Sequence, residues 1–310
     1  MPRTGTTTTT DITINAREVD FVTRFGLNWE DLRTILGISR PVKKALGTKL
    51  TSYTVSSKGG LAQAPAEGAE TSLTEFEIKP ATYSDITVER YEKAVTVDAI
   101  AQYGGEIAVE KTDDQFLVEL QDNVMGRFYT FINTGSLKGT QKTWQRALAI
   151  AKGAVLNKFK KMHKNVTEVV GFANIMDFYD WLGDQQITVQ TLNGIQYIKG
   201  FMGYETLILL SEDEIPAKTV IATPVENLVL YYIDPSDSDF AKAGIDYTTE
   251  GETNLIGVHI AADYKRGTTN TFALLGMALW AEYLDGIAVV TVGSSNTTPA
   301  VATPPASGQQ

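Results

Sequence analysis

The stretch from residue 48 to residue 105 constrains the fold of this chain most, because it has the pattern of two strands joined by a polar tip. Apolar and polar residues alternate at 50–55 and again at 75–80, which is the period of a half-buried strand. The tip, residues 56–71, holds three glycines, one proline and almost no large apolar side chain. A compact body does not bury such a hairpin easily, so we expect it to project and to leave strand edges open.

An arm with open edges gains its order on another chain. We therefore predict that the tip contacts a neighbouring subunit. This favours assembly over catalysis as the function of the protein. The glutamates of the tip are expected to meet cations there, because a tip without an apolar wall cannot perturb their pKa values for acid–base chemistry. The predicted contact residues are Lys58, Gly59, Gly60, Glu67, Gly68 and Glu70.

Size and composition set wider limits on the class of protein. A chain of 310 residues buries roughly three-quarters of its unfolded surface, which leaves room for two lobes. The absence of cysteine excludes disulfides, thiolate metal sites and cysteine nucleophiles, and it is consistent with folding in a reducing cytoplasm. A net charge of -10 opposes general affinity for nucleic acid. With no run of about 18 apolar residues and no signal-like start, we expect neither a membrane contact nor secretion.

The first 47 residues are expected to form a polar arm and two short helices. Residues 1–15 are rich in threonine, and Asn15 with Glu18 makes a capping pair for the first helix. Asn28 is expected to open the second helix, and Gly37 is expected to end it.

A long helix is expected after the hairpin, beyond Gly104 and Gly105. Thr112 and Gln115 have the spacing of a capping box at its start, and Asn133 marks its end. Its apolar residues recur at steps of three and four, as on one face of a helix: Leu117, Leu120, Val124, Phe128 and Phe131.

A second lobe is expected from about Ser136. Its first helix has one apolar stripe, consisting of Trp144, Leu148, Ala151, Val155, Phe159 and Met162. A second short helix is expected at 175–182, and strands are expected at 168–172, 196–198, 203–210, 219–222, 227–233, 255–264 and 286–292. Residues 271–280 fit either a helix or a strand. The composition from Gly293 onward cannot support a core, so we expect a flexible tail at 293–310.

Polar clusters elsewhere give no catalytic, cofactor or metal site. His163 and His259 have no ligand-type partner at short spacing. The aspartates of residues 234–239 lack the order of a calcium loop, so we interpret them as a solvated turn. The basic run 158–164 fits cations held at the negative end of a helix. The alternative interpretation of this run is a small patch for nucleic acid or a scaffold protein.

The order of these elements, together with short motifs, resembles the major capsid proteins of tailed bacteriophages, which have the Hong Kong 97-type fold. The motifs at the hairpin are AEGAE at 66–70, LTEF at 73–76 and YEKAVTVD at 91–98. Further along, GYETLI at 203–208, EIPAK at 214–218 and LVLYY at 228–232 are similar to the strands that end the family's axial domain. DGIAVV at 285–290 is similar to its closing strand.

The resemblance implies an α+β fold with five parts. These are an N-terminal arm with short helices (1–47), an extended hairpin loop (48–98), a peripheral domain with a long spine helix (99–135 and 236–292), an axial α/β domain (136–235) and the flexible tail. It further implies that the chain assembles with itself as pentamers and hexamers into an icosahedral shell around double-stranded DNA. The implied location of the protein is the virion, which is assembled in the host bacterial cytoplasm.

The resemblance also implies partners and leaves alternatives. Because the fold is expected to start near residue 17, scaffolding would come from a separate protein or be dispensed with. A portal is a further partner, and contact with packaged DNA would be independent of sequence. Some members of the family crosslink a loop lysine to an asparagine of a neighbouring subunit. Lys58 lies near the loop tip, but neither the acceptor asparagine nor the catalytic glutamate is matched in this sequence, so crosslinking is not supported. The nearest alternative is an encapsulin-like bacterial nanocompartment that loads an enzyme. An α+β hydrolytic or sugar-binding enzyme and a phage tail-tube protein are more distant ones.

Overall fold

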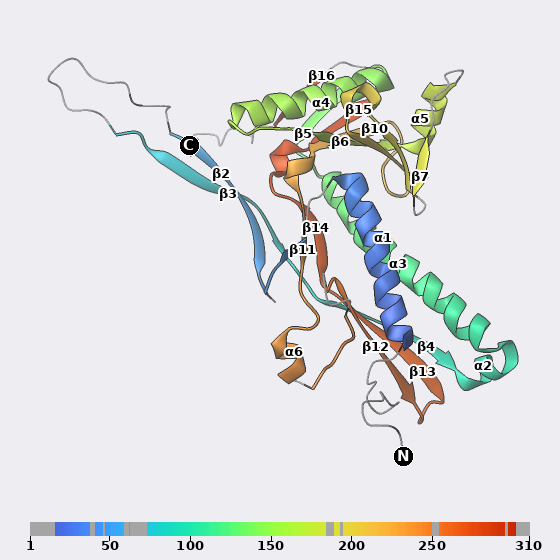
Figure 1. Ribbon diagram of the computed structural model, residues 1–310. Helices are drawn as coiled ribbons and strands as arrows, with labels where there is room; N and C mark the ends of the chain where they lie inside the picture. The colour runs from blue at the N-terminus through green and yellow to red at the C-terminus, as the bar shows by residue number, and fades with distance from the viewer. Residues whose placement is uncertain are drawn as a thin grey trace, which may run out of the picture.

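The computed structural model describes residues 16–37, 41–45, 47–58, 62, 73–183, 189–192, 195–242, 244–249, 254–294 and 297–301. Figure 1 shows an upper and a lower lobe joined end to end, and a thin ribbon that projects to one side. The chain passes between the lobes more than once, so neither lobe is a continuous stretch of sequence. Within the described residues, no helix has both the length and the apolar character needed to cross a membrane.

The upper lobe is built on one eight-stranded mixed sheet. In spatial order its strands are β16 (Thr297–Val301), β5 (Leu137–Gln141), β15 (Ala288–Val292), β10 (Thr219–Pro224), β6 (Val169–Asn174), β9 (Thr206–Leu210), β8 (Ile195–Lys199) and β7 (Gln190–Leu192). The pairs β5–β15 and β6–β9 are parallel, and the other neighbours are antiparallel.

Helix α4 (Trp144–Lys161) covers one face of this sheet (Figure 1). The predicted stripe on α4 is confirmed from Trp144 to Phe159, which are buried in one cluster with the sheet, whereas Met162 follows the helix end and is only half-buried. Helix α5 (Ile175–Leu182) begins where the Asn174 side chain accepts a hydrogen bond from the Met176 N–H, and it ends at Gly183 with a φ of 42°. The opposite face of the sheet packs into the core shared with the lower lobe.

The lower lobe places two long helices beside a three-stranded antiparallel sheet. The helices are α1 (Ala16–Leu36) and α3 (Lys111–Ile132), and the strands in order are β12 (Ile256–Asp263), β13 (Thr268–Leu275) and β4 (Glu89–Thr96). A second three-stranded sheet links the lobes, in the order β1 (Val42–Lys43), β11 (Leu228–Tyr232) and β14 (Met277–Ala281).

Shorter elements complete the described chain. The ribbon consists of β2 (Lys49–Ser57) and β3 (Phe76–Asp85). Helix α2 (Val97–Tyr103) and a π-helix (Glu106–Glu110) precede α3, and α6 (Ser238–Lys242) is a single turn. The 3-10 turns are Phe201–Gly203, Val225–Asn227 and Leu284–Gly286.

Helix α1 is continuous, so the predicted division into two helices at Asn28 is wrong. The Asn28 amide lies inside the helix and donates to Gln121 on α3 at 3.4 Å. One buried apolar stripe runs along the whole helix and consists of Phe21, Val22, Phe25, Trp29, Leu32 and Leu36. Gly37 ends the helix as predicted, with a φ of 72°, whereas Asn15 lies outside the described residues.

The expected capping box at the start of α3 is also wrong. Helical structure already runs through residues 106–110, and the Thr112 hydroxyl donates back to the Ala108 carbonyl at 2.9 Å. Gln115 donates to Glu119 on the exposed surface instead of capping the helix. The predicted apolar stripe and the end at Asn133 are confirmed.

The C-terminal third differs from the sequence interpretation in three ways. Residues 271–280 are strand in β13 and β14, which resolves the open alternative. β15 lies in the upper sheet, although the interpretation grouped 236–292 with 99–135. Residues 297–301 of the expected flexible tail form β16, an edge strand on β5. That pairing needs a close approach, since a Cβ on Gly139 would lie 2.8 Å from Pro299.

Candidate subunit interface on the projecting ribbon

The ribbon formed by β2 and β3 is a two-stranded sheet of its own. Its pairing runs from Lys49 opposite Asp85 to Ser57 opposite Phe76, with a register shift next to Ser52. Nine paired residues extend about 30 Å at the rise of a strand. Figure 1 shows the ribbon pointing away from the body, as the sequence predicted. An isolated pair of strands is marginally stable in water, so the ribbon gains from an external surface.

One face of the outer half of the ribbon is apolar and uncovered. Val55 and Ile78 are directly opposite each other in the register, so their side chains share a face, and Phe76 lies on that face two residues from Ile78. Their exposed fractions are 52%, 66% and 62% in the order Val55, Ile78 and Phe76. Leu73, just before β3, is 96% exposed. Exposed apolar side chains grouped in this way mark an interaction surface.

Of the six predicted tip residues, only Lys58 lies within the described part of the chain. Its backbone N–H donates to the Glu75 carbonyl at 2.8 Å, and its ammonium lies 3.3 Å from the Glu75 carboxylate. Both side chains are about two-thirds exposed, so this ion pair contributes between about 0 and 1 kcal/mol. Gly59, Gly60, Glu67, Gly68 and Glu70 lie outside the described residues, and their subunit contact stays a prediction.

A groove with mostly apolar walls lies at the root of the ribbon. It has a volume of about 310 Å³, and it is bounded by the segment after β3, by α3 and by β14. Phe131 of α3 stacks on Trp280 of β14 in its wall, with ring centroids 4.0 Å apart. The lining residues are Ile86, Thr87, Val124, Arg127, Phe128, Thr130, Phe131, Thr134, Met277, Ala278, Leu279 and Trp280. Sequence inspection missed this groove, because its walls come from three distant segments.

The apolar face of the ribbon cannot fill the groove of its own chain. Phe76 is the first residue of β3, and Ile86 follows its last residue, so the two are ten positions apart along an extended strand. An extended segment of that length holds its ends about 33 Å apart. The chain therefore presents an apolar protrusion and an apolar recess at separate places, which is the arrangement of a head-to-tail contact between copies.

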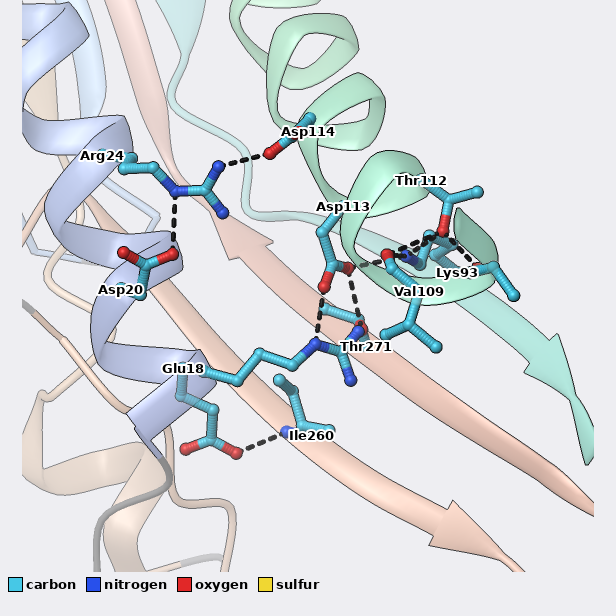
Figure 2. A network of polar contacts seen from close by, with 12 residues as sticks. Glu18, Asp20, Arg24, Lys93, Val109, Thr112, Asp113, Asp114, Ile260 and Thr271 are labelled. Carbon is cyan, nitrogen blue, oxygen red and sulfur yellow. Dashed lines mark hydrogen bonds and ion pairs between the residues drawn. The ribbon is translucent and has the colours of Figure 1, made fainter. Parts of the chain in front are cut away.

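A buried charge cluster fixes α1 against the rest of the lower lobe (Figure 2). The Asp113 carboxylate is 3% exposed, accepts from the Arg17 guanidinium at 2.5 Å and lies 2.6 Å from the Lys93 ammonium. Burial alone would raise the pKa of Asp113, but the hydrogen bonds from Arg17 and Lys93 outweigh it and hold that pKa below its usual value. On the next turn of α1, Arg24 pairs with Asp20 and with Asp114 of α3.

Glu18, whose predicted capping partner Asn15 lies outside the described residues, has two hydrogen-bond partners in the C-terminal part of the chain. Its carboxylate accepts from the Ile260 N–H at 2.6 Å and from the Thr248 hydroxyl at 2.5 Å, so it joins α1 to the edge of β12 (Figure 2). Together, Glu18 and Asp113 anchor α1 at two places across the sheet.

The other predicted polar residues have structural partners. His259 stacks on Phe272, and the backbone N–H of His163, just after α4, donates to the Lys160 carbonyl at 3.1 Å. Asp234 is buried in its turn and accepts from Lys43 at 2.8 Å and from the Ser236 N–H at 2.9 Å. Burial raises the pKa of Asp234, but these hydrogen bonds outweigh it and the pKa lies below its usual value. No group of three or more His, Asp or Glu that could hold a metal ion is found among the described residues.

Comparison with known proteins finds a likeness in structure and none in sequence. No model of a known protein family matches the chain, and a search of curated proteins finds no relative. The virus-like particle from Pyrococcus furiosus matches with a TM-score of 0.50 at 10% identity, covering 89% of this chain and 100% of that one. The chain has the Hong Kong 97-type fold.

Two further solved structures match at lower scores. The Cyanophage A-1(L) capsid asymmetric unit has a TM-score of 0.48 at 14% identity, covering 92% of this chain and 98% of that one. The SrpI encapsulin complex from Synechococcus elongatus PCC 7942 has a TM-score of 0.44 at 11% identity, with 92% and 95% covered. Because both scores lie below 0.5, the fold is assigned on the Pyrococcus particle alone.

The fold confirms the resemblance that the motifs indicated. The ribbon, with its exposed apolar face, and the groove at its root are the candidate site.

Proposed function

We propose that this chain is the major capsid protein of a tailed phage, which assembles as pentamers and hexamers into an icosahedral shell around double-stranded DNA. The observation that supports this most is the uncovered apolar face of the ribbon, carried on a fold shared with a virus-like particle. That face has no partner in its own chain among the described residues, and a neighbouring copy supplies one.

The parts of the fold take the following roles in the proposal. α3 is the spine helix of a peripheral domain that includes the sheet β12–β13–β4, and the upper lobe is the axial domain that clusters around each five- or six-fold axis. α1 continues the N-terminal arm. The tip at Lys58 and residues 59–70 contacts a neighbour within the ring.

The ribbon of each copy docks on the groove of the next one. Phe76 and Ile78 are apolar and of a size that a recess of about 310 Å³ accepts. Since protrusion and recess are different patches, the contact is heterologous and closes into a ring when the rotation between copies allows it. Affinity then comes from many modest contacts summed around the ring.

The proposal is tested by expressing the full chain alone, and together with a candidate scaffolding protein encoded upstream of it, and imaging the products by negative-stain electron microscopy. Closed hollow particles are expected. A strictly monomeric protein under both conditions would overturn the proposal. Deleting residues 57–70 is expected to abolish particles, and normal particle yield from this variant would contradict the role of the tip.

The encapsulin-like alternative shares the fold, so the cargo decides between the two kinds of shell. A phage capsid has terminase and portal genes beside its own, takes a portal as a partner and ends in the virion. A nanocompartment has a neighbouring enzyme gene with a C-terminal targeting peptide. DNA protected from nuclease inside native particles supports the phage assignment, and an enclosed enzyme supports the alternative.

A further inference from the structure

Charge is distributed very unevenly along this acidic chain. Residues 123–167 contain no Asp or Glu, but they contain nine Lys or Arg. Of the 27 Lys and Arg in the whole chain, 18 therefore remain outside this stretch, beside all 37 acidic residues. The nine cations are Arg127, Lys138, Lys142, Arg146, Lys152, Lys158, Lys160, Lys161 and Lys164.

The fold brings three of these cations to one side of α4 in the upper lobe. β5 and α4 span the stretch, and Figure 1 shows α4 lying across the outside of the sheet. The apolar stripe of α4 faces the sheet, so Arg146, Lys160 and Lys161 are left exposed on the outer side. This outer side of α4, defined by those three residues, is the basic face.

Neighbouring groups account for some cations but not for the basic face. Lys158 lies 2.7 Å from Asp285, the Lys164 ammonium lies over the Tyr283 ring, and Lys152 donates to the Gly203 carbonyl. Arg146, Lys160 and Lys161 have no acidic partner within ion-pair distance among the described residues.

The helix dipole explains only half of this arrangement. The negative end of the helix dipole stabilises cations in the last turn of α4, and this accounts for Lys160 and Lys161. Arg146 lies in the first turn, where the dipole disfavours a cation, and no acid accompanies it there. An anionic partner that lies along the whole helix accounts for the exposed cations in both its first and its last turn.

We propose that the basic face of α4 binds the phosphate backbone of double-stranded nucleic acid, without reading its sequence. This inference rests on the proposed function and names the surface that meets the enclosed DNA. Arg146 and Lys161 are 15 residues apart, or about 22 Å along the helix, which spans six to seven base pairs at about 3.4 Å each. The acidic remainder of the chain repels the duplex, so the basic face also sets the orientation of the subunit on it.

The proposal is tested with the unassembled full-length chain and a fluorescent random-sequence 20-base-pair duplex, by anisotropy between 50 and 200 mM salt. The variant R146E/K160E/K161E is compared with K242E/K265E/R266E, which makes the same change in net charge on other exposed cations. The α4 variant is expected to lose at least tenfold in affinity, and the control less than twofold. The slope of log affinity against log salt is expected to fall by about 0.9 for each phosphate that the variant no longer neutralises.

Equal binding by both variants, or no binding by the natural chain, overturns the proposal. Binding of the basic face to polyglutamate in preference to the duplex also overturns it, in favour of an acidic protein partner. If the triple variant does not fold, K160Q and K161Q singly are expected to lower the affinity about threefold each, and unchanged affinity in both contradicts the proposal. Particles in the electron microscope report on shell formation independently, so particles without duplex binding reject this inference and leave the shell function intact.

Discussion

Phe131 of α3 and Trp280 of β14 lie nearly face to face, with ring centroids 4.0 Å apart and ring planes 22° apart. The two residues come from distant parts of the sequence, and their stack joins the long helix to the sheet that links the lobes. Because the stack also forms a wall of the groove at the root of the ribbon, the proposed contact between copies uses the same pair of side chains that holds the helix to the sheet.

Replacing Phe131 with Ala is expected to lower the free energy of unfolding by about 3 kcal/mol, since it removes a large apolar side chain and an aromatic pair. The measurement is urea denaturation of the unassembled chain, followed by circular dichroism. Thr130 is the matched control, because it is exposed on the same turn, and Thr130→Ala is expected to change that free energy by less than about 0.5 kcal/mol. Equal effects of the two substitutions would contradict the role of the stack.

Replacing Asp113 with Asn is expected to lower the free energy of unfolding by about 3–5 kcal/mol at pH 7, because it leaves Arg17 and Lys93 without their buried partner. The pKa of Asp113 is lower in the folded chain than its ordinary value of 3.8. Its stabilising contribution is therefore present above that ordinary value and is lost as the pH falls through the folded pKa.

The measurement for Asp113 is urea denaturation at pH 7 and at pH 3. The natural chain is expected to lose more stability between these values than the Asn variant does. Asp114→Asn is the control, since the Asp114 side chain is 48% exposed and is expected to matter by less than about 1 kcal/mol. An Asn variant as stable as the natural chain at pH 7 would show that the cluster does not hold α1.

How far the sequence predicts this structure depends on the range of the interaction concerned. Local patterns located the ribbon, the stripe of α4 and the end of α1 at Gly37, because alternation, helical period and glycine turns act within a few residues. Thr112 and Asn28 gave wrong predictions of helix starts. Each lies inside a longer helix, where tertiary packing and hydrogen bonds within the helix override a local start signal.

Contacts between segments that are distant in the sequence could not be predicted from local sequence patterns. The charge cluster of Asp113 draws Arg17 and Lys93 from two other elements, and no spacing rule relates them. β16 forms although its composition is that of a tail, because an edge strand on β5 needs backbone hydrogen bonds more than apolar side chains. The groove was missed for the same reason, since Trp280 meets Phe131 only in the folded chain.

Replacing both Phe76 and Ile78 with Ser is expected to reduce the yield of closed particles at least tenfold. The urea concentration at the midpoint of unfolding of the unassembled chain is expected to stay the same. Both side chains are more than half exposed in the single chain, so their removal affects the interface between copies and not the fold. Glu75→Gln, just before the same strand, is the control, expected to leave the yield unchanged because its ion pair with Lys58 is exposed. A normal yield from F76S/I78S, measured by electron microscopy, would reject the apolar face as an interface.

Engineered cysteines test the head-to-tail contact directly, because the chain contains no cysteine of its own. The double variant F76C/T130C carries one thiol on the ribbon and one at the groove. A disulfide needs Cα atoms within about 7 Å, whereas Phe76 lies about 33 Å along the strand from Ile86, which lines the groove of the same chain, so oxidation is expected to link different copies. Assembled particles, oxidised and then denatured, are expected to give a ladder that ends at five and six linked chains.

The control pair F76C/K242C keeps the ribbon thiol and moves the second one to the exposed helix α6, away from the groove. It is expected to stay monomeric on a denaturing gel under the same oxidation. Single variants F76C and T130C, mixed before assembly, are expected to give dimers only, because each copy then has one reactive end. A ladder from the control pair as strong as that from F76C/T130C, or none from either pair in well-formed particles, would place the ribbon elsewhere on its neighbour.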